Sequence, residues 1–82
     1  MKAVVVAVNY RRGLVAYEIE RGDYGYFEVL GSDDFEVDEP IYGNLTTLGD
    51  VTVTKVDSGE KVDVYVEDFG MTHKRVIQQI SN

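Results

Sequence analysis

The sequence predicts an all-β domain that carries one short helix at its C-terminus. Three observations predict it. Apolar residues recur at every second position in several short segments, and turn-forming glycine and aspartate residues separate these segments. After residue 70 the apolar spacing changes to three and four, as in a helix. With 82 residues, the chain can bury one hydrophobic core but not two, so we expect a single domain over 1–82.

The first predicted strand, residues 2–9, is apolar on both faces, because alanine and valine fill nearly all of its positions. Such a strand lies in the centre of a sheet or closes a barrel. A polar connection ending at Gly13 leads to a second strand over residues 14–20. Alternation places three of its apolar side chains on one face: Val15, Tyr17 and Ile19.

A turn at Gly22 and Asp23, predicted as type II′ with glycine at its first central position, leads to a third strand over residues 24–30. The pattern then breaks into a polar loop over residues 31–40. Proline cannot donate to a central ladder, so Pro40 is expected to end this loop. Phe35 and Val37 are expected to anchor it to the core.

The second half of the chain predicts three more strands. Residues 41–48 form a weaker strand that Gly43 interrupts. Residues 51–56 and 61–66 flank a four-residue turn and form the clearest hairpin. Its inward candidates recur at period two: Val51, Val53, Val62, Val64 and Val66.

Thr72 is predicted to cap a C-terminal helix within residues 71–81. An isolated helix this short is marginal in water, so it must dock on the β-structure of residues 1–67. The face available for docking carries His73, Val76, Ile77 and Ile80.

Tight turns between the strands favour a small antiparallel barrel of five to six strands over parallel β-α-β winding, which needs helical crossovers. Among small barrels, the oligonucleotide/oligosaccharide-binding (OB) type fits best, with a three-strand meander, a longer connection and a closing hairpin. A Src-homology-like barrel is the alternative.

Two segments resemble the paired strand motifs of cold-shock-type OB barrels over roughly residues 9–30. They are Tyr10-Arg11-Arg12-Gly13-Leu14-Val15-Ala16-Tyr17 and Tyr26-Phe27-Glu28-Val29. In that family, aromatic rings on these strands stack on bases. The resemblance implies single-stranded nucleic-acid (RNA) binding through Tyr10, Arg11, Arg12, Tyr17, Tyr26 and Phe27. Leu14 and Ala16 stand where the family has aromatic rings.

Composition excludes several classes of function. Without cysteine, the chain has no disulfide, no thiolate metal site and no thiol nucleophile. The net charge of −7 disfavours nonspecific binding to nucleic acid or to an anionic membrane. Residues 18–39 concentrate this charge, with −8, whereas residues 1–17 carry +3. The apolar run at residues 3–8 is too short for a signal peptide or a membrane span, so we expect a cytoplasmic protein.

The groups that could carry chemistry do not specify a reaction. His73 is the only histidine, which is too few for a tetrahedral zinc site. The acidic loop lacks the spacing of a helix-loop-helix calcium site. Glu18 could form an acid/base pair with Glu20 or with Glu28. Glutamate at alternate positions of a strand is also what a half-solvated sheet shows. We therefore expect no enzyme, no cofactor and no metal.

The interpretation that remains is a non-enzymatic binding or protein-interaction module. Tyrosine in strands is a natural contact residue because its ring buries area while its hydroxyl stays hydrated. The candidate contact residues are Tyr24, Tyr42 and Tyr65. The acidic segment favours a basic protein partner, or an identical subunit. Nucleic-acid binding is the alternative, and an enzyme for a small molecule is a second one.

Overall fold

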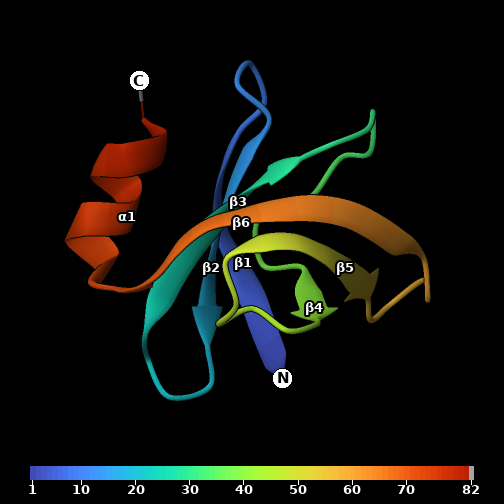
Figure 1. Cartoon of the computed structure of the whole chain (residues 1–82), viewed down its shortest axis with the longest axis horizontal. Helices are drawn as coiled ribbons and strands as arrows, with labels where there is room; N and C mark the ends of the chain where they lie inside the picture. The colour runs from blue at the N-terminus through green and yellow to red at the C-terminus, as the bar shows by residue number, and fades with distance from the viewer. Residues whose placement is uncertain (82) are drawn as a thin grey trace.

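Six strands close into a barrel, and one helix packs against its outer side (Figure 1). The computed structural model describes residues 1–81, so the predicted domain 1–82 reaches one residue beyond them. The strands are β1 (Lys2–Asn9), β2 (Leu14–Ile19), β3 (Tyr24–Val29), β4 (Pro40–Tyr42), β5 (Gly49–Lys55) and β6 (Lys61–Met71), and the helix is α1 (His73–Ile80). The predicted all-β barrel with a short C-terminal helix is confirmed.

The strand order around the barrel is β1-β2-β3-β6-β5-β4, and every neighbouring pair is antiparallel. The connection after β3 returns the chain to β4 beside β1, so the first four strands form a Greek key. A closed barrel of six strands has one strand more than the five-stranded OB barrel. The finer choice between an OB-like and a Src-homology-like barrel stays a prediction.

Strand β1 carries a β-bulge and is apolar on both faces. The register with β2 shifts between Val5 and Ala7. Ala3 and Val5 belong to the core inside the barrel, and Val8 packs against it, whereas Val6 and Ala7 pack against α1. The inner face of β1 is therefore covered by the barrel interior, and its outer face is covered by the helix at Val6 and Ala7, whereas Val4 stays exposed.

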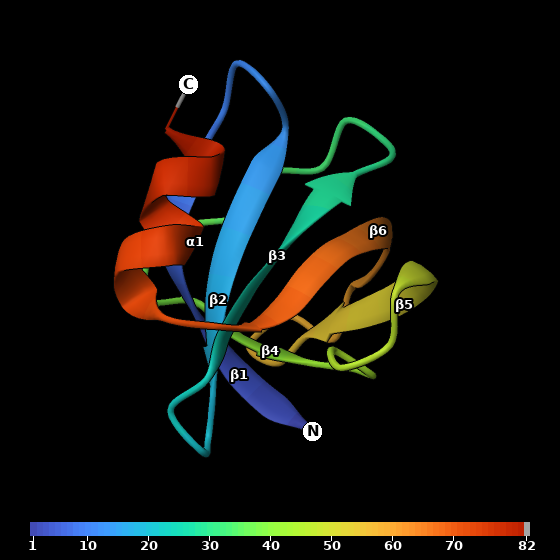
Figure 2. The same ribbon diagram turned by 60° about the vertical axis from the view of Figure 1, so that its left-hand side comes forward.

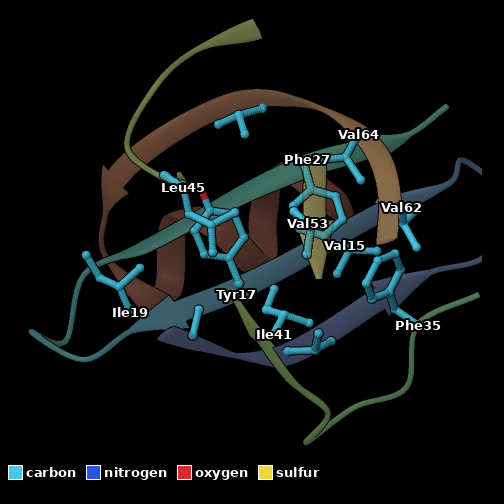
Figure 3. Close-up of a cluster of buried hydrophobic side chains, with 13 residues drawn as sticks. Val15, Tyr17, Ile19, Phe27, Phe35, Ile41, Leu45, Val53, Val62 and Val64 are labelled. Atoms are coloured by element: carbon cyan, nitrogen blue, oxygen red, sulfur yellow. Dashed lines mark hydrogen bonds between the residues drawn. The ribbon is translucent and has the colours of Figure 1, made fainter. Parts of the chain in front are cut away.

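The barrel interior is filled mainly by the residues that alternation placed inward (Figure 3). Val15, Tyr17 and Ile19 all lie in it, as predicted. The Tyr17 ring stacks on Phe27 with 5.7 Å between centroids, and Phe27 meets Phe35 edge-on at 5.3 Å. Phe35 thus anchors the acidic loop as expected, but the expectation for Val37 was wrong, because its side chain is 52% exposed.

The largest differences from the predicted bounds lie at β4 and β6. The weak strand expected over residues 41–48 is only Pro40–Tyr42, and Pro40 is its first residue, where a missing N–H is tolerated. The following loop is held by Leu45, which is fully buried and whose carbonyl accepts a hydrogen bond of 2.6 Å from the Tyr17 hydroxyl. β6 continues to Met71, five residues beyond the predicted end.

The β2–β3 turn also differs. The Gly22 N–H donates to the Ile19 carbonyl, and the Ile19 N–H donates to the Asp23 carbonyl. Gly22, with φ +86°, is therefore the last residue of a three-residue loop instead of the first central residue of a type II′ turn.

Helix α1 lies on the outer face of β1, β2 and β3 (Figure 2). Thr72 caps its N-terminus, as predicted, because the Thr72 side-chain oxygen accepts from the Arg75 N–H at 3.2 Å. Val76 and Ile80 are buried against Leu14 and Ala16 of β2. This second, smaller core holds the helix on the barrel.

Candidate functional site

The outer face of β1, β2 and β3 is the surface on which the cold-shock resemblance would place bases. In this chain, α1 covers it. Leu14 and Ala16, the residues that replace aromatic rings of the family pattern, are buried under Val76 and Ile80. Small and aliphatic side chains at these two positions allow the helix to pack closely on β2.

Two residues of the candidate nucleic-acid interface lie inside the barrel. Tyr17 and Phe27 have no exposed surface, and Figure 3 shows both rings among the core valines. A base cannot stack on a ring that has no accessible face. The structure thus removes Tyr17 and Phe27 from any binding surface, and the reason is that the same period-two alternation points them inward.

The loop between β1 and β2 holds the C-terminal end of α1. The Asn9 side-chain amide donates to the Ile80 carbonyl at 2.6 Å, and the Arg12 guanidinium donates to the Gln79 carbonyl at 3.5 Å. These donors satisfy carbonyls that a helix C-terminus leaves unpaired. In the same loop, the Tyr10 hydroxyl donates to the Phe35 carbonyl at 3.0 Å, although 61% of the residue is exposed. Arg11 is exposed.

Tyr26 lies at the edge of the helix, half buried, in a negative environment. Partial burial raises the pKa of the Tyr26 phenol, and the carboxylates of Glu67 and Asp68 raise this pKa further, while Arg12 opposes them. A phosphate placed here would face these two carboxylates. Of the six residues in the predicted nucleic-acid interface, only Tyr10, Arg11 and Arg12 thus lie together in one exposed loop.

The three predicted contact tyrosines lie on different surfaces. Tyr24 is half buried under α1, where its ring meets His73 edge-on at 5.2 Å. Tyr42 pairs with Lys2 and Thr54, and Tyr65 pairs with Glu28 and Asp50. Because Asp50 and Thr54 are four residues apart on β5, Tyr42 and Tyr65 are separated by about 13 Å along the strands.

The most distinctive exposed surface is centred on Tyr65. We call it the β3–β6–β5 face and define it by the outward side chains of these three adjacent strands. Tyr65, 42% exposed, lies in a cross-strand row between Glu28 of β3 and Asp50 of β5. Side chains directly opposite one another in such a row have Cβ atoms about 5 Å apart. One ring is therefore flanked by two carboxylates.

The next row of this face extends the same pattern. Asp63 lies two residues from Tyr65 on β6, and its carboxylate accepts a hydrogen bond of 3.0 Å from the Thr52 hydroxyl. Leu30, 53% exposed, lies beside it, with the Leu30 N–H donating to the Asp63 carbonyl. These residues line a shallow depression of about 310 Å³.

The β3–β6–β5 face is strongly acidic. Its outward carboxylates include those of Glu28, Asp50, Asp63 and Glu67, all exposed, and Lys61 lies at the hairpin end of the face. Alternation in β6 already implied that Tyr65, between inward Val64 and Val66, points outward. The neighbouring carboxylates could not be found from the sequence, because they come from β3 and β5.

The acidic loop forms a second negative region, around a hollow that also includes the β5–β6 turn. Lys55 lies within it: its ammonium is 3.7 Å from the Glu60 carboxylate, 4.8 Å from the centre of the Phe35 ring, and donates to the Asp34 carbonyl. Within residues 1–81, no three His, Asp or Glu side chains are grouped closely enough to hold a metal ion.

Of the carboxylates considered for catalysis, Glu18 and Glu20 line one hollow, whereas Glu28 lies apart from Glu18. His73 is exposed at the start of α1, against Tyr24. Glu18 pairs with Tyr24 and Leu14 pairs with Glu28, so the two carboxylates lie at opposite ends of the β2–β3 ladder. Four residues along a strand span about 13 Å, which exceeds the separation of roughly 5–9.5 Å that paired glycosidase carboxylates need.

None of the helical structure within residues 1–81 is both long and apolar enough to cross a membrane. Comparison with protein-family models, with curated proteins and with solved structures finds no match for the chain.

Proposed function

We propose that this domain is a non-enzymatic protein-interaction module that binds a basic segment of a partner protein on its β3–β6–β5 face. The observation that carries the proposal is the row of Glu28, Tyr65 and Asp50, which places an exposed aromatic ring between two carboxylates. An aromatic ring supplies contact area, and its face attracts a lysine or arginine side chain. The flanking carboxylates pair with the same cations.

Charge supports a basic partner. At least four carboxylates against one lysine on this face give a local field that attracts positive segments and repels negative ones. Each exposed ion pair is worth about 0.2–1 kcal/mol, so the ring and the exposed Leu30 must supply part of the affinity. Such binding is weak and depends strongly on salt, as expected of an exchangeable contact.

Nucleic acid fits the same surfaces poorly. The β3–β6–β5 face repels phosphates, and the face of the cold-shock resemblance lies under α1. Tyr10, Arg11 and Arg12 lie together in one short loop, whereas a single nucleic-acid strand is bound along a groove several nucleotides long.

The proposal is tested by fluorescence anisotropy with a labelled peptide in which lysine and valine alternate. We expect salt-sensitive binding of this peptide, and no binding of the matching glutamate–valine peptide or of a labelled oligothymidine. Tyr65→Ala should weaken binding about tenfold. Tyr42→Ala is the matched control, because Tyr42 is at least as exposed but lies on β4.

A second pair of variants separates local contacts from overall charge. The double variant Glu28→Lys/Asp50→Lys should abolish peptide binding. The double variant Glu36→Lys/Asp38→Lys makes the same change in net charge in the acidic loop and should leave most of the affinity. Equal losses in both, or tighter binding of oligothymidine than of the basic peptide, would contradict the proposal.

A further inference from the structure

A second exposed surface lies around β1 and β4, beyond β5 in the strand order, and its centre is apolar. Val4 of β1 pairs with Glu18 of β2 on one side and with Pro40 of β4 on the other. The Val56 N–H donates to the Pro40 carbonyl at 3.1 Å, which brings this second valine to the same place. Val4 is 41% exposed and Val56 48% exposed, and with Pro40 they line a groove of about 370 Å³, here called the β1–β4 groove.

The rim of the groove is electrically balanced. Lys2, Glu18 and Glu20 line it, and the adjoining hollow adds Arg21 and Tyr42. Among the side chains of this rim, two cations and two carboxylates cancel, whereas the chain as a whole carries −7. Two copies of the chain therefore repel one another over most approaches, but not through this surface.

We propose that the β1–β4 groove is the contact surface of a weak, two-fold symmetric dimer of this chain. A two-fold interface must be complementary to itself, because the same surface of both protomers forms it. If one residue contacts a second residue of the partner, that second residue contacts the first residue of the partner in turn. Lys2 lies two residues along β1 from Val4, whereas Glu18 lies across the strand from Val4. Turning one copy about the valines can thus bring Lys2 of each protomer to Glu18 of the other.

Other modes and occupants fit less well. All six strands within residues 1–81 are paired in a closed barrel, so a second chain cannot add a strand at an edge and must use side chains. A strongly basic ligand would meet Lys2 and Arg21, and a strongly acidic one would meet Glu18 and Glu20. A second copy of the chain presents both cations and carboxylates, so it can pair with the cations and the carboxylates of the rim.

Sedimentation equilibrium of the purified chain over a concentration series tests the dimer. Because the apolar area is small, we expect a dimer dissociation constant of about tens to hundreds of micromolar, at the weak end of specific contacts. Val4→Lys should weaken dimerisation at least about tenfold. Leu30→Lys is the matched control, since it places the same charge at a similarly exposed apolar residue of the β3–β6–β5 face and should not weaken the dimer.

A charge swap tests the geometry. Lys2→Glu and Glu18→Lys should each weaken dimerisation, because each places like charges together, and the double variant should restore it. Circular dichroism melting confirms that each variant is folded. A chain that stays monomeric at about 1 mM, or a double variant no better than the singles, would overturn the dimer. Neither result affects peptide binding on the β3–β6–β5 face, which is measured separately.

Discussion

Replacing Tyr17 with phenylalanine removes one oxygen atom from the centre of the barrel. The Tyr17 hydroxyl donates to the Leu45 carbonyl at 2.6 Å, and both residues have no exposed surface. In Tyr17→Phe, this carbonyl loses its partner, and water cannot replace it. Leaving a buried acceptor unpaired costs about 1–3 kcal/mol. We therefore expect the free energy of unfolding to fall by about 2 kcal/mol, from a total on the order of 4–12 kcal/mol.

The matched control is Tyr10→Phe, which removes the same atom from the same kind of hydrogen bond. The Tyr10 hydroxyl also donates to a backbone carbonyl, that of Phe35, but Tyr10 is 61% exposed. Water can take over this bond, so the expected cost stays within about 0.5 kcal/mol. Urea unfolding followed by circular dichroism measures both, and Tyr17→Phe should lower Tm by roughly 8–16 °C. Equal costs for the two variants would refute the assignment of stability to the buried bond.

Three further predictions concern the same core and the helix. Burial, aided by the Asp68 carboxylate, raises the pKa of Tyr17, so the folded chain keeps a proton that the unfolded chain releases near pH 10. The free energy of unfolding, measured by urea titration, should stay level below pH 10 and fall above it by up to about 1.4 kcal/mol per pH unit. An identical slope in Tyr17→Phe would contradict this. Gly25→Ala would place a Cβ 2.5 Å from the Tyr17 hydroxyl and should lower Tm strongly, whereas Gly31→Ala, with its nearest contact at 3.4 Å, should leave Tm nearly unchanged. Thr72→Ala should cost about 1 kcal/mol in urea unfolding through the lost N-cap, and an unchanged unfolding midpoint would show that the helix does not depend on it.

Local patterns predicted the strands well, because a strand's alternation is written in adjacent residues. β1 was predicted with its observed bounds, and β2 and β3 within one residue at their ends. Residues 43–48 were wrongly predicted as strand, and the loop that they form is held by a bond between Tyr17 and Leu45, which are 28 residues apart. No local pattern reports such a contact.

The candidate site could be predicted only in part. Alternation placed Tyr17 on one face with Val15 and Ile19, and the structure confirms that this face is inward, which conflicts with a base-stacking role. Tyr65 is outward for the same reason. Its carboxylate neighbours depend on the pairing of β6 with β3 and β5, which are separated from it by loops, and therefore had to come from the structure.

Chemical-shift mapping by NMR tests most directly where this domain binds. The ¹⁵N-labelled chain is titrated at low salt with the peptide of alternating lysine and valine. We expect the largest shifts at backbone amides of the β3–β6–β5 face, around Glu28, Asp50, Asp63 and Tyr65, and their loss in Tyr65→Ala. Shifts confined to Tyr10, Arg11 and the C-terminal end of α1, or no shifts at all, would contradict the central claim that the β3–β6–β5 face is the interaction surface.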